Sequence, residues 1–381
     1  MPKDIKLNFL NSDEEERYQK HFTLKEIGYE GQLNLKNSSV LCIGAGGLGS
    51  SVLLYLAAAG IGRIGIVDND KVEKSNLQRQ IIHETNTIGN LKIDSARERI
   101  KKFNPNCEVL TFSERINPKN ALELIKKFDV ICDCSDNFGT RYLINDSCLI
   151  LNKPLVFGSV QGFEGQVSVF NLCKNSPNLR DLFPESPSNN AVPSCAEYGV
   201  VGVSTGLIGI LQVNEIIKII LKKGEILDGK ILIFDLLNMN MKKLHLKGDQ
   251  LNKRIKNLIR FEEFYDSNEN CEDNNEIKRI NANDFNSLYK SKPNKILLID
   301  VRENEEFSNS AIEGSISIPL SHLNNESDLK YIQKESLIKE VFTICQSGKR
   351  SVKASKILSK FKIQSRSIEG GIEMVKEILS D

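Results

Sequence analysis

The stretch VLCIGAGGLGS, residues 40–50, places four apolar residues directly before a cluster of glycines. The apolar run Val40–Ile43 predicts a buried strand, and Gly49–Ala59 predicts the helix that follows it. Glycines at a strand-to-helix junction allow a tight turn and close approach of the backbone to a phosphate. The helix N-terminus adds free N–H groups and a positive dipole end. The stretch therefore predicts a nucleotide site on a βαβ unit.

Short apolar runs and helical patterns continue to alternate after this stretch. The further predicted strands are Arg63–Val67, Val109–Phe112, Val130–Cys132, Leu155–Gly158, Gln166–Asn171 and Lys230–Asp235. The further predicted helices are Asp94–Phe103, Ala121–Phe128 and Gly206–Leu221. This rhythm is typical of an α/β fold with a doubly wound, Rossmann-like, mostly parallel sheet.

The composition changes near residue 251, which predicts a second domain. The segment YDSNENCEDNNE, residues 265–276, is acidic, rich in Asn and almost without apolar residues. A smaller α/β pattern follows, with strands predicted at Ile296–Asp300, Phe342–Ile344 and Ser365–Ile368, and a helix at Arg350–Lys360. We therefore predict one domain over residues 1–250, a linker over 251–276 and a small α/β domain over 277–381.

Charge and cysteine content limit the classes of partner. The 381 residues carry a formal net charge of +1, which gives no general attraction to nucleic acid or an anionic membrane. The first residues resemble no secretory signal, and polar residues interrupt the apolar run Val200–Ile220, so we expect no membrane span. Nine cysteines at scattered spacings suit a reducing compartment, and we expect the protein in the cytoplasm.

Polar residues after the predicted strands indicate which nucleotide binds. Asp68 ends the second strand, at the place where a carboxylate holds ribose hydroxyls. These features alone would also suit an NAD-dependent dehydrogenase. However, the segments that follow carry two cations, amides and an acid, which suit a triphosphate with its magnesium better than a dinucleotide. Those residues are Ser75, Asn76, Arg79, Lys92, Asp136 and Asn137.

Several motifs together resemble the MoeB/ThiF/HesA adenylyltransferases, which are relatives of ubiquitin-activating enzymes. The resemblance covers about residues 10–240. It rests on Arg17-Tyr18, Val40–Ser50, Asp68-Asn69-Asp70, Asn76–Gln80, Ile88–Lys92 and Asp136-Asn137-Phe138. It implies ATP and magnesium as cofactors. It implies as substrate the C-terminal glycine carboxylate of a small ubiquitin-like sulfur carrier protein ending in Gly-Gly.

The resemblance also assigns roles to individual residues. It implies that Asp136 is the magnesium-associated acid, and that Arg79 and Lys92 stabilise charge on the phosphates as pyrophosphate leaves. Arg17 would reach the nucleotide across the interface of a homodimer. The residues implied to surround ATP are Gly44, Gly46, Gly47, Gly49, Asp68, Ser75, Asn76, Arg79, Lys92, Asp136, Asn137 and Arg17.

Two features concern cysteine. Many members of the family bind a structural zinc through two Cys-x-x-Cys pairs, but Asn178 and Asp181 stand where one pair is usual. We therefore expect no structural zinc. Cys195, in the segment PSCAEYGV (residues 193–200), lies where the family's crossover cysteine lies. It is either a small buried residue or a nucleophile in the transfer steps.

The segment ICQSGKRS, residues 344–351, predicts a second reactive cysteine. It joins a predicted strand to a predicted helix, so backbone N–H groups and the helix dipole, together with Lys349 and Arg350, should favour a thiolate or persulfide at Cys345. A phosphatase-like loop would present the same features.

The flanking pattern resembles a rhodanese domain over about residues 277–381. It consists of Asp300-Val301-Arg302-Glu303, Phe307, Ile312–Pro319 and Gly370-Gly371, with Ala311 where a histidine is common. The resemblance implies that Cys345 carries a persulfide received from a persulfide or thiosulfate donor. It also implies that Arg350 helps to hold an anionic donor.

The two resemblances together predict adenylation of a carrier, followed by sulfur transfer to give a thiocarboxylate for molybdopterin or thiamine biosynthesis. A linker between the domains would raise the local concentration of sulfur. Two alternatives stay open. One is an adenylyltransferase whose rhodanese domain only binds or regulates, and the other is a nucleotide-binding oxidoreductase.

Overall fold

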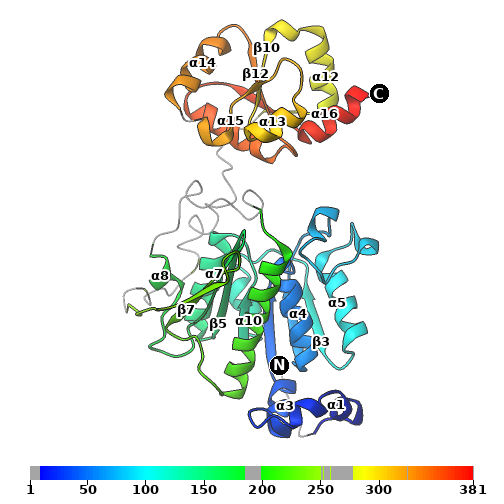
Figure 1. Cartoon of the computed structure of the whole chain (residues 1–381), viewed down its shortest axis with the longest axis vertical. Helices are drawn as coiled ribbons and strands as arrows, with labels where there is room; N and C mark the ends of the chain where they lie inside the picture. The colour runs from blue at the N-terminus through cyan, green and yellow to red at the C-terminus, as the bar shows by residue number, and fades with distance from the viewer. Residues whose placement is uncertain are drawn as a thin grey trace. The chain divides into compact units, whose positions relative to one another are not determined.

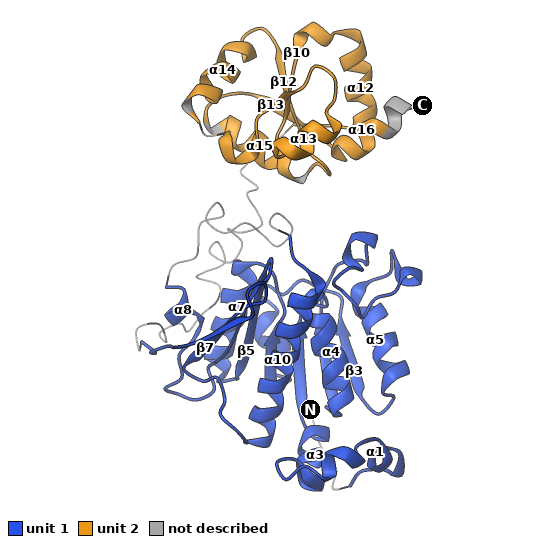
Figure 2. Cartoon of the chain, in the orientation of Figure 1, with its two compact units in different colours: residues 1–271 blue, residues 272–381 orange. Residues whose placement is uncertain are grey.

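The computed structural model describes residues 9–184, 199–249, 252, 258, 278–323 and 325–380. The chain divides into two compact units, Met1–Cys271 and Glu272–Asp381 (Figure 2). Leu258, inside the range predicted as a linker, is buried in a core cluster of the first unit. The first unit therefore includes this leucine, and the domain bounds given above stay a prediction.

The described residues of the first unit form an eight-stranded sheet of order β3-β2-β1-β4-β5-β6-β7-β8 (Figure 1). Its strands are β1 (Ser39–Ile43), β2 (Arg63–Val67), β3 (Glu108–Phe112), β4 (Val130–Asp133), β5 (Leu155–Gln161), β6 (Glu164–Phe170), β7 (Lys230–Asp235) and β8 (Asn240–His245). The strands β3 to β5 pair in parallel, and β6, β7 and β8 continue the sheet antiparallel. The predicted doubly wound, mostly parallel sheet is confirmed.

Helices cover both faces of this sheet. They are α1 (Ser12–Arg17), α2 (Gln19–Phe22), α3 (Gly28–Lys36), α4 (Gly47–Ala59), α5 (Lys92–Phe103), α6 (Ala121–Ile125), α7 (Phe138–Leu151), α8 (Leu179–Leu182) and α10 (Gly202–Leu221). Successive residues of β1 point to opposite faces, so Val40 and Cys42 join one apolar cluster and Leu41 and Ile43 the other. Figure 1 shows α4, α5 and α10 side by side along one face. Helices α6 and α7 cover the other.

The short helices α1, α2, α3 and α8 were not predicted, and neither were two larger elements of the first unit. Helix α7 buries Arg141, Asn145 and Asp146 together with apolar residues, so its pattern shows no clear apolar stripe. Strand β8 is exposed at every position, because it is the edge strand and carries two lysines. Both elements depend on tertiary contacts that the local sequence does not show.

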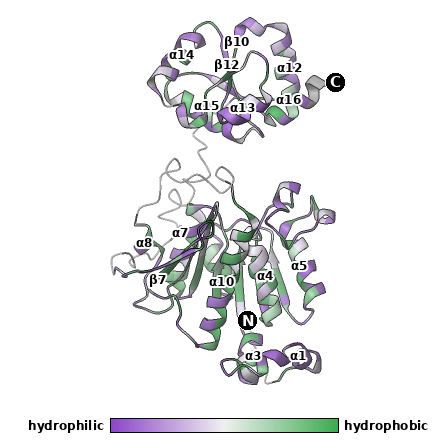
Figure 3. Cartoon of the chain, viewed as in Figure 1, coloured by the Kyte–Doolittle hydropathy of each residue, from purple (hydrophilic) through white to green (hydrophobic). Residues whose placement is uncertain are grey.

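One described helix, α10, is long and apolar enough to cross a membrane by length and composition alone. It packs against α4, β5 and β6, and it buries the polar side chains of Gln212 and Glu215. Figure 3 shows α4 and α10 as largely hydrophobic helices. The core helix of a soluble protein passes the same composition test.

The second unit holds a five-stranded parallel sheet of order β11-β10-β12-β13-β9. Its strands are β9 (Arg279–Ile280), β10 (Ile296–Asp300), β11 (Ile316–Ser317), β12 (Glu340–Ile344) and β13 (Ser365–Ile368). Its helices are α12 (Ala282–Ser291), α13 (Asn304–Ser310), α14 (Glu326–Ser336), α15 (Lys349–Lys360) and α16 (Gly371–Ser380). Apolar clusters on both faces give the unit its own core. The predicted small α/β domain is confirmed.

The glycine turn brings β1 and α4 into close contact. A Cβ atom on Gly49 would lie 2.2 Å from the Gly44 carbonyl oxygen, so only glycine fits there without movement of the backbone. Gly44 also has φ of 102°, which a residue with a side chain rarely adopts. These two glycines thus fix the junction between strand and helix.

Gly49→Ala should destabilise the protein by about 1–3 kcal/mol, because the added methyl group must displace the turn. Gly206→Ala is the matched control, since the added atom on this α10 glycine meets nothing within 4 Å. That control should leave stability unchanged or raise it by up to about 1 kcal/mol. Urea unfolding of both variants measures the difference, and equal stabilities would contradict the assigned role of Gly49.

Candidate functional site

The glycine turn is held by hydrogen bonds to both sides of the Ala45 residue. The Ala45 N–H donates to Oδ2 of Asp68 at 2.8 Å, and the Asp70 N–H donates to the other carboxylate oxygen at 2.8 Å. The Ala45 carbonyl lies 3.0 Å from Nε2 of His83. Asp68 follows β2, so these contacts join the turn after β1 to the end of the next strand.

His83 is a site residue that the sequence analysis missed. Its Nδ1 lies 2.9 Å from the Ser95 hydroxyl on α5, and its ring is buried. Burial lowers the pKa of His83, and nearby Lys92 lowers it further, so the ring is neutral at pH 7. A carbonyl oxygen only accepts, so Nε2–H donates to the Ala45 carbonyl, while Nδ1 and the Thr87 hydroxyl both lie within hydrogen-bond distance of the Ser95 hydroxyl. In the sequence, the only signal for a role of His83 is its position shortly after the Asn76–Gln80 motif.

Lys92 is the first residue of α5 and is largely buried. Its ammonium lies 2.7 Å from Oδ2 of Asp70. Burial raises the pKa of the Asp68 carboxyl, and the positive charge of Lys92 opposes that rise. The structure thus brings Asp68 and Lys92 together beside the turn.

The residues after β4 form a second group at the same edge of the sheet, because β1 and β4 are neighbouring parallel strands. Asp136 is exposed, and Asn137 caps α7 by accepting a hydrogen bond from the Thr140 N–H at 2.8 Å. Behind them Asp133 is fully buried, and burial raises the pKa of its carboxyl. Arg141 is also buried and donates to the Ser135 and Gly158 carbonyls, which anchors this loop.

The segment from Ser75 to Gln80 follows β2. Asn76 is buried and accepts from the Glu73 N–H at 3.1 Å. The Arg79 guanidinium donates to the Ser75 carbonyl at 3.0 Å. Among the described residues, the buried Gln80 Oε1 and Asp133 Oδ2 have no hydrogen-bond partner. Both belong to segments that flank the glycine turn, so this edge of the sheet holds buried oxygen atoms that a ligand could satisfy.

Arg17 does not join these residues within one chain. It donates to the carbonyl of Phe103 at 3.2 Å, at the last residue of α5, whereas Lys92 is the first. At 1.5 Å per residue, the two ends of this helix are about 16 Å apart. Helices α1 and α3 lie at the amino ends of the strands (Figure 1), since α3 leads directly into β1. Cys195 lies outside the described residues.

Cys345 follows β12 in the second unit and is 1% exposed. The Ser351 N–H donates to its sulfur at 3.3 Å. The Cys345 carbonyl accepts from the Ile372 N–H at 2.9 Å, and a Cβ on Gly371 would lie 2.2 Å from that carbonyl oxygen. The loop before α15 therefore closes around the sulfur and packs against the turn that opens α16.

Arg350, a cation of this loop whose side chain the structure describes, is engaged in an ion pair. Both terminal nitrogens of Arg350 donate to Glu306 on α13, each at 2.7 Å. This pair lowers the pKa of the Glu306 carboxyl and raises that of the Arg350 guanidinium. Nearby Arg302 is buried and donates to Asp300 through Nε and Nη2, and its Nη1 donates to the Gln346 amide oxygen.

Two family models match the sequence. The ThiF family model matches residues 18–254, and the rhodanese-like domain model matches residues 281–377. This chain belongs to the ThiF family. The first unit contains the ThiF domain and the second the rhodanese domain, as the sequence resemblances predicted.

Two curated relatives are named for one or both of these activities. The adenylyltransferase and sulfurtransferase MOCS3 of Drosophila virilis is 38% identical over 90% of this chain and 78% of its own length. A probable molybdopterin-synthase adenylyltransferase of Porphyra purpurea is 39% identical over 97% of this chain and 94% of its own. The chain is accordingly a nucleotidyltransferase with a sulfurtransferase domain.

Solved structures share the fold of the ThiF domain. PaaA is 23% identical, with a TM-score of 0.56 over 65% of this chain and 78% of that one. Escherichia coli MccB solved with ATP is 20% identical, with a TM-score of 0.57 over 65% of this chain and 75% of that one.

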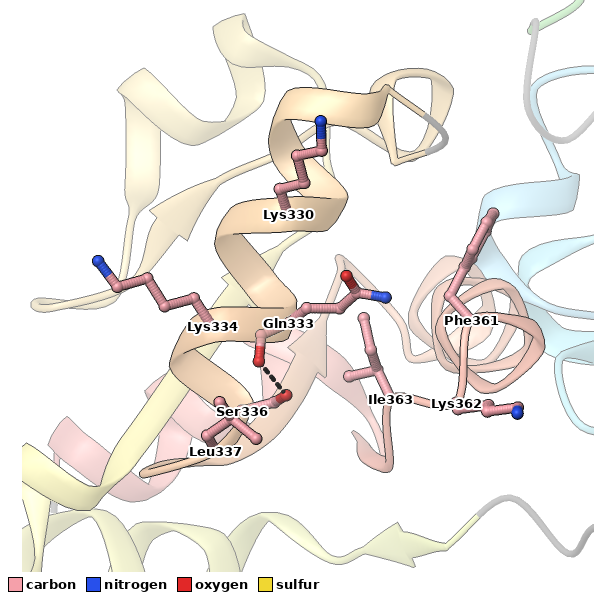
Figure 4. Close-up of a pocket in the computed structure, with 8 residues that line it drawn as sticks. All are labelled: Lys330, Gln333, Lys334, Ser336, Leu337, Phe361, Lys362 and Ile363. Atoms are coloured by element: carbon pink, nitrogen blue, oxygen red, sulfur yellow. Dashed lines mark hydrogen bonds between the residues drawn. The ribbon is translucent and has the colours of Figure 1, made fainter.

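A shallow pocket of the rhodanese domain lies away from its cysteine. It has a volume of about 550 Å³ and lies between α14 and the segment after α15 (Figure 4). It is lined by Lys330, Gln333, Lys334, Ser336, Leu337, Phe361, Lys362 and Ile363. These residues precede β12 and β13, whereas Cys345 follows β12, so the pocket lies at the opposite end of the strands.

The two positions considered above for a zinc-binding cysteine pair hold polar side chains in the ThiF domain. Asn178 and Asp181 cap α8 reciprocally, since the Arg180 N–H donates to Asn178 and the Asn178 N–H to Asp181. Asp181 also accepts from the Asp249 N–H and the Asn252 amide, each at 2.8 Å. Within the described parts of the chain, no group of three or more His, Cys, Asp or Glu could hold a metal ion.

His83→Ala should slow ATP–pyrophosphate exchange by about tenfold to a hundredfold, because the glycine turn loses its fixed position. His83→Gln keeps one N–H donor and should recover part of the rate. His21→Ala is the control, since His21 bonds Gln32 in the N-terminal helices. Equal rates for the two alanine variants would contradict the role of His83.

Purified protein should contain far less than one zinc per chain, because oxygen and amide groups occupy the usual cysteine positions. A chelator should leave its melting temperature unchanged. Elemental analysis measures the content, and stoichiometric zinc would overturn the expectation.

Proposed function

We propose that this enzyme adenylates the C-terminal glycine of a small ubiquitin-like sulfur carrier protein and converts it to a thiocarboxylate. One observation carries the proposal. The same chain contains a glycine turn that hydrogen bonds hold beside Lys92 and a buried cysteine, Cys345, whose sulfur accepts a backbone hydrogen bond. The first can make a carboxylate electrophilic, and the second can hold a nucleophilic sulfur. The similarity to a probable molybdopterin-synthase adenylyltransferase favours molybdopterin biosynthesis over the thiamine pathway.

ATP is the nucleotide of this proposal. The N–H groups at the start of α4 would contact its phosphates, and Asp68 would hold the ribose. The carrier carboxylate attacks the α-phosphorus, and pyrophosphate leaves with the bonding electrons. Lys92 and Arg79 would stabilise the negative charge that develops on the phosphates. Positioning and charge suffice, because this step needs no general base.

Magnesium suits the group after β4. This ion prefers one or two carboxylates together with phosphate oxygens, and Asp136 offers an exposed carboxylate at that edge. Asp136 would hold the ion, which neutralises phosphate charge when bound. Asn137 keeps the loop in place through its cap on α7.

We further propose a homodimer in which Arg17 serves the partner's nucleotide. Its place at the far end of α5 supports this arrangement, because Arg17 lies remote from the turn of its own chain. An isologous dimer would supply two such arginines symmetrically.

Sulfur transfer then links the two domains chemically. The outer sulfur of a Cys345 persulfide attacks the acyl carbon, and AMP leaves with the bonding electrons. The carrier is now joined to Cys345 through a disulfide. A second thiol must attack the Cys345 sulfur, so that the carrier leaves as the thiocarboxylate. Cys195 is the candidate for that thiol within the chain. The alternative function, a nucleotide-binding oxidoreductase, would give Cys345 no role.

The intact mass of a carrier ending in Gly-Gly tests the proposal. It is incubated with the enzyme, ATP, magnesium and either thiosulfate or a small persulfide. We expect a gain that matches replacement of one oxygen by sulfur, lost with Cys345→Ala. Adenylated carrier without sulfur would support the alternative in which the rhodanese domain only binds or regulates. No change, together with no ATP–pyrophosphate exchange, would refute the adenylation.

Cys195→Ser should retain pyrophosphate exchange and lose thiocarboxylate formation in the same assay, with covalent carrier–enzyme disulfide accumulating. Unchanged transfer would leave Cys195 as a residue without a chemical role.

A further inference from the structure

The charges around Cys345 do not favour a dianionic sulfur donor. Among the described side chains of this loop, Arg350 is the cation nearest the sulfur in sequence, and Glu306 binds both of its terminal nitrogens. A carboxylate in this two-pronged geometry occupies the edge between the two terminal nitrogens, which is one of the two guanidinium edges that could bind the oxygens of thiosulfate. Glu306 and an oxyanion donor therefore compete for Arg350.

Among the side chains that the structure describes, the other arginine near the loop does not replace Arg350. The Arg302 guanidinium is 1% exposed and is paired with the fully buried Asp300. Gln346, next to Cys345, donates to the exposed carboxylate of Glu373 at 3.1 Å. Two carboxylates, Glu306 and Glu373, thus lie at the residues that surround the cysteine loop.

Arg350 is nevertheless close enough to interact with the reacting sulfur. Negative charge on Cys345 raises the pKa of the Arg350 guanidinium, in addition to the larger effect of Glu306. The Glu306–Arg350 pair is partly exposed, with side-chain exposures of 37% and 25%, so solvent and a small anion can reach it. The pair therefore controls how much positive charge an incoming donor meets.

We propose that Glu306 is a specificity-determining residue that disfavours dianionic donors such as thiosulfate by occupying Arg350. The inference rests on the sulfur-transfer half of the proposed function and adds a preference between donors. A persulfide needs no second anion site, because its reacting end carries a single sulfur charge.

The chemistry balances for both donors. With thiosulfate, the Cys345 thiolate bonds the outer sulfur, the S–S bond breaks and sulfite leaves with the electron pair. With a persulfide, the thiolate bonds the outer sulfur and the donor thiolate leaves with the electron pair. Two negative charges accompany the sulfur only in the first case, so only that reaction benefits from a free guanidinium.

Sulfur transfer to cyanide by the full-length enzyme tests the proposal with two donors, thiosulfate and the persulfide of 2-mercaptoethanol. Glu306→Gln should lower the KM for thiosulfate by about tenfold, since it frees a partly screened unit charge. The kcat, and the KM for the persulfide, should change by less than about twofold. Glu305→Gln is the control, because it removes the same charge from an exposed neighbouring position and leaves the pair in place.

A second background separates competition from a structural effect. When Arg350→Gln is already present, adding Glu306→Gln can remove only through-space repulsion, so the KM for thiosulfate should fall by less than about twofold. Melting temperatures of all variants are measured alongside.

Several outcomes would overturn the proposal. An unchanged or raised KM for thiosulfate in Glu306→Gln would show that Glu306 does not compete with the donor. Equal gains with both donors would show a general opening of the site. Wild-type transfer from neither donor would refute the sulfur-transfer half of the proposed function itself, an outcome distinct from transfer without a Glu306 effect.

Discussion

The hydrogen bonds made by Ala45 determine where three βα units meet. Its N–H is fixed by Asp68 at the end of β2, and its carbonyl by His83, which also bonds Ser95 on α5. The turn between β1 and α4 can therefore not shift without disturbing its neighbours. A neutral histidine suits this place, because a charged ring would be buried and would lie near the positive charge of Lys92. The nucleotide edge of the sheet is rigid for these reasons.

Both domains place their chemistry at a junction between a parallel strand and the N-terminus of a helix. Gly46 precedes α4, and Gly348, with φ of 88°, precedes α15. The two junctions differ in what surrounds them. The first combines a buried lysine with carboxylates after two strands, whereas the second encloses a single sulfur and pairs its arginine with Glu306. The same kind of strand-to-helix junction is thus suited to a polyanion in the first domain and to a single nucleophilic sulfur in the second.

Local sequence predicted the elements whose side chains are apolar in a regular pattern. The ranges of β2, β7, β10 and β13 matched the prediction, and α4 and α5 began only two residues earlier than predicted. Helix α7 and strand β8 could not be predicted in this way. Helix α7 buries charged residues among its apolar ones, and strand β8 has no buried residue.

The residues of the candidate site also fall into those that local sequence could locate and those that it could not. Glycines and acids next to the strands could be located from spacing alone, and the structure brings Asp68 and Lys92 together near the turn. The roles of His83 and Glu306 could not be predicted from spacing, because they depend on contacts with residues distant in the chain. His83 meets Ala45 across 38 positions, and Glu306 meets Arg350 across 44.

The reciprocal cap at α8 has a consequence for how the chain folds. A corner closed by a metal ion completes only when an ion arrives, so its last step depends on the supply of that ion. Here one oxygen of the Asp181 carboxylate joins α8 to the segment at residues 249–252 through groups made with the chain itself. Closure of this corner is therefore unimolecular, and its rate is independent of the cell's metal supply.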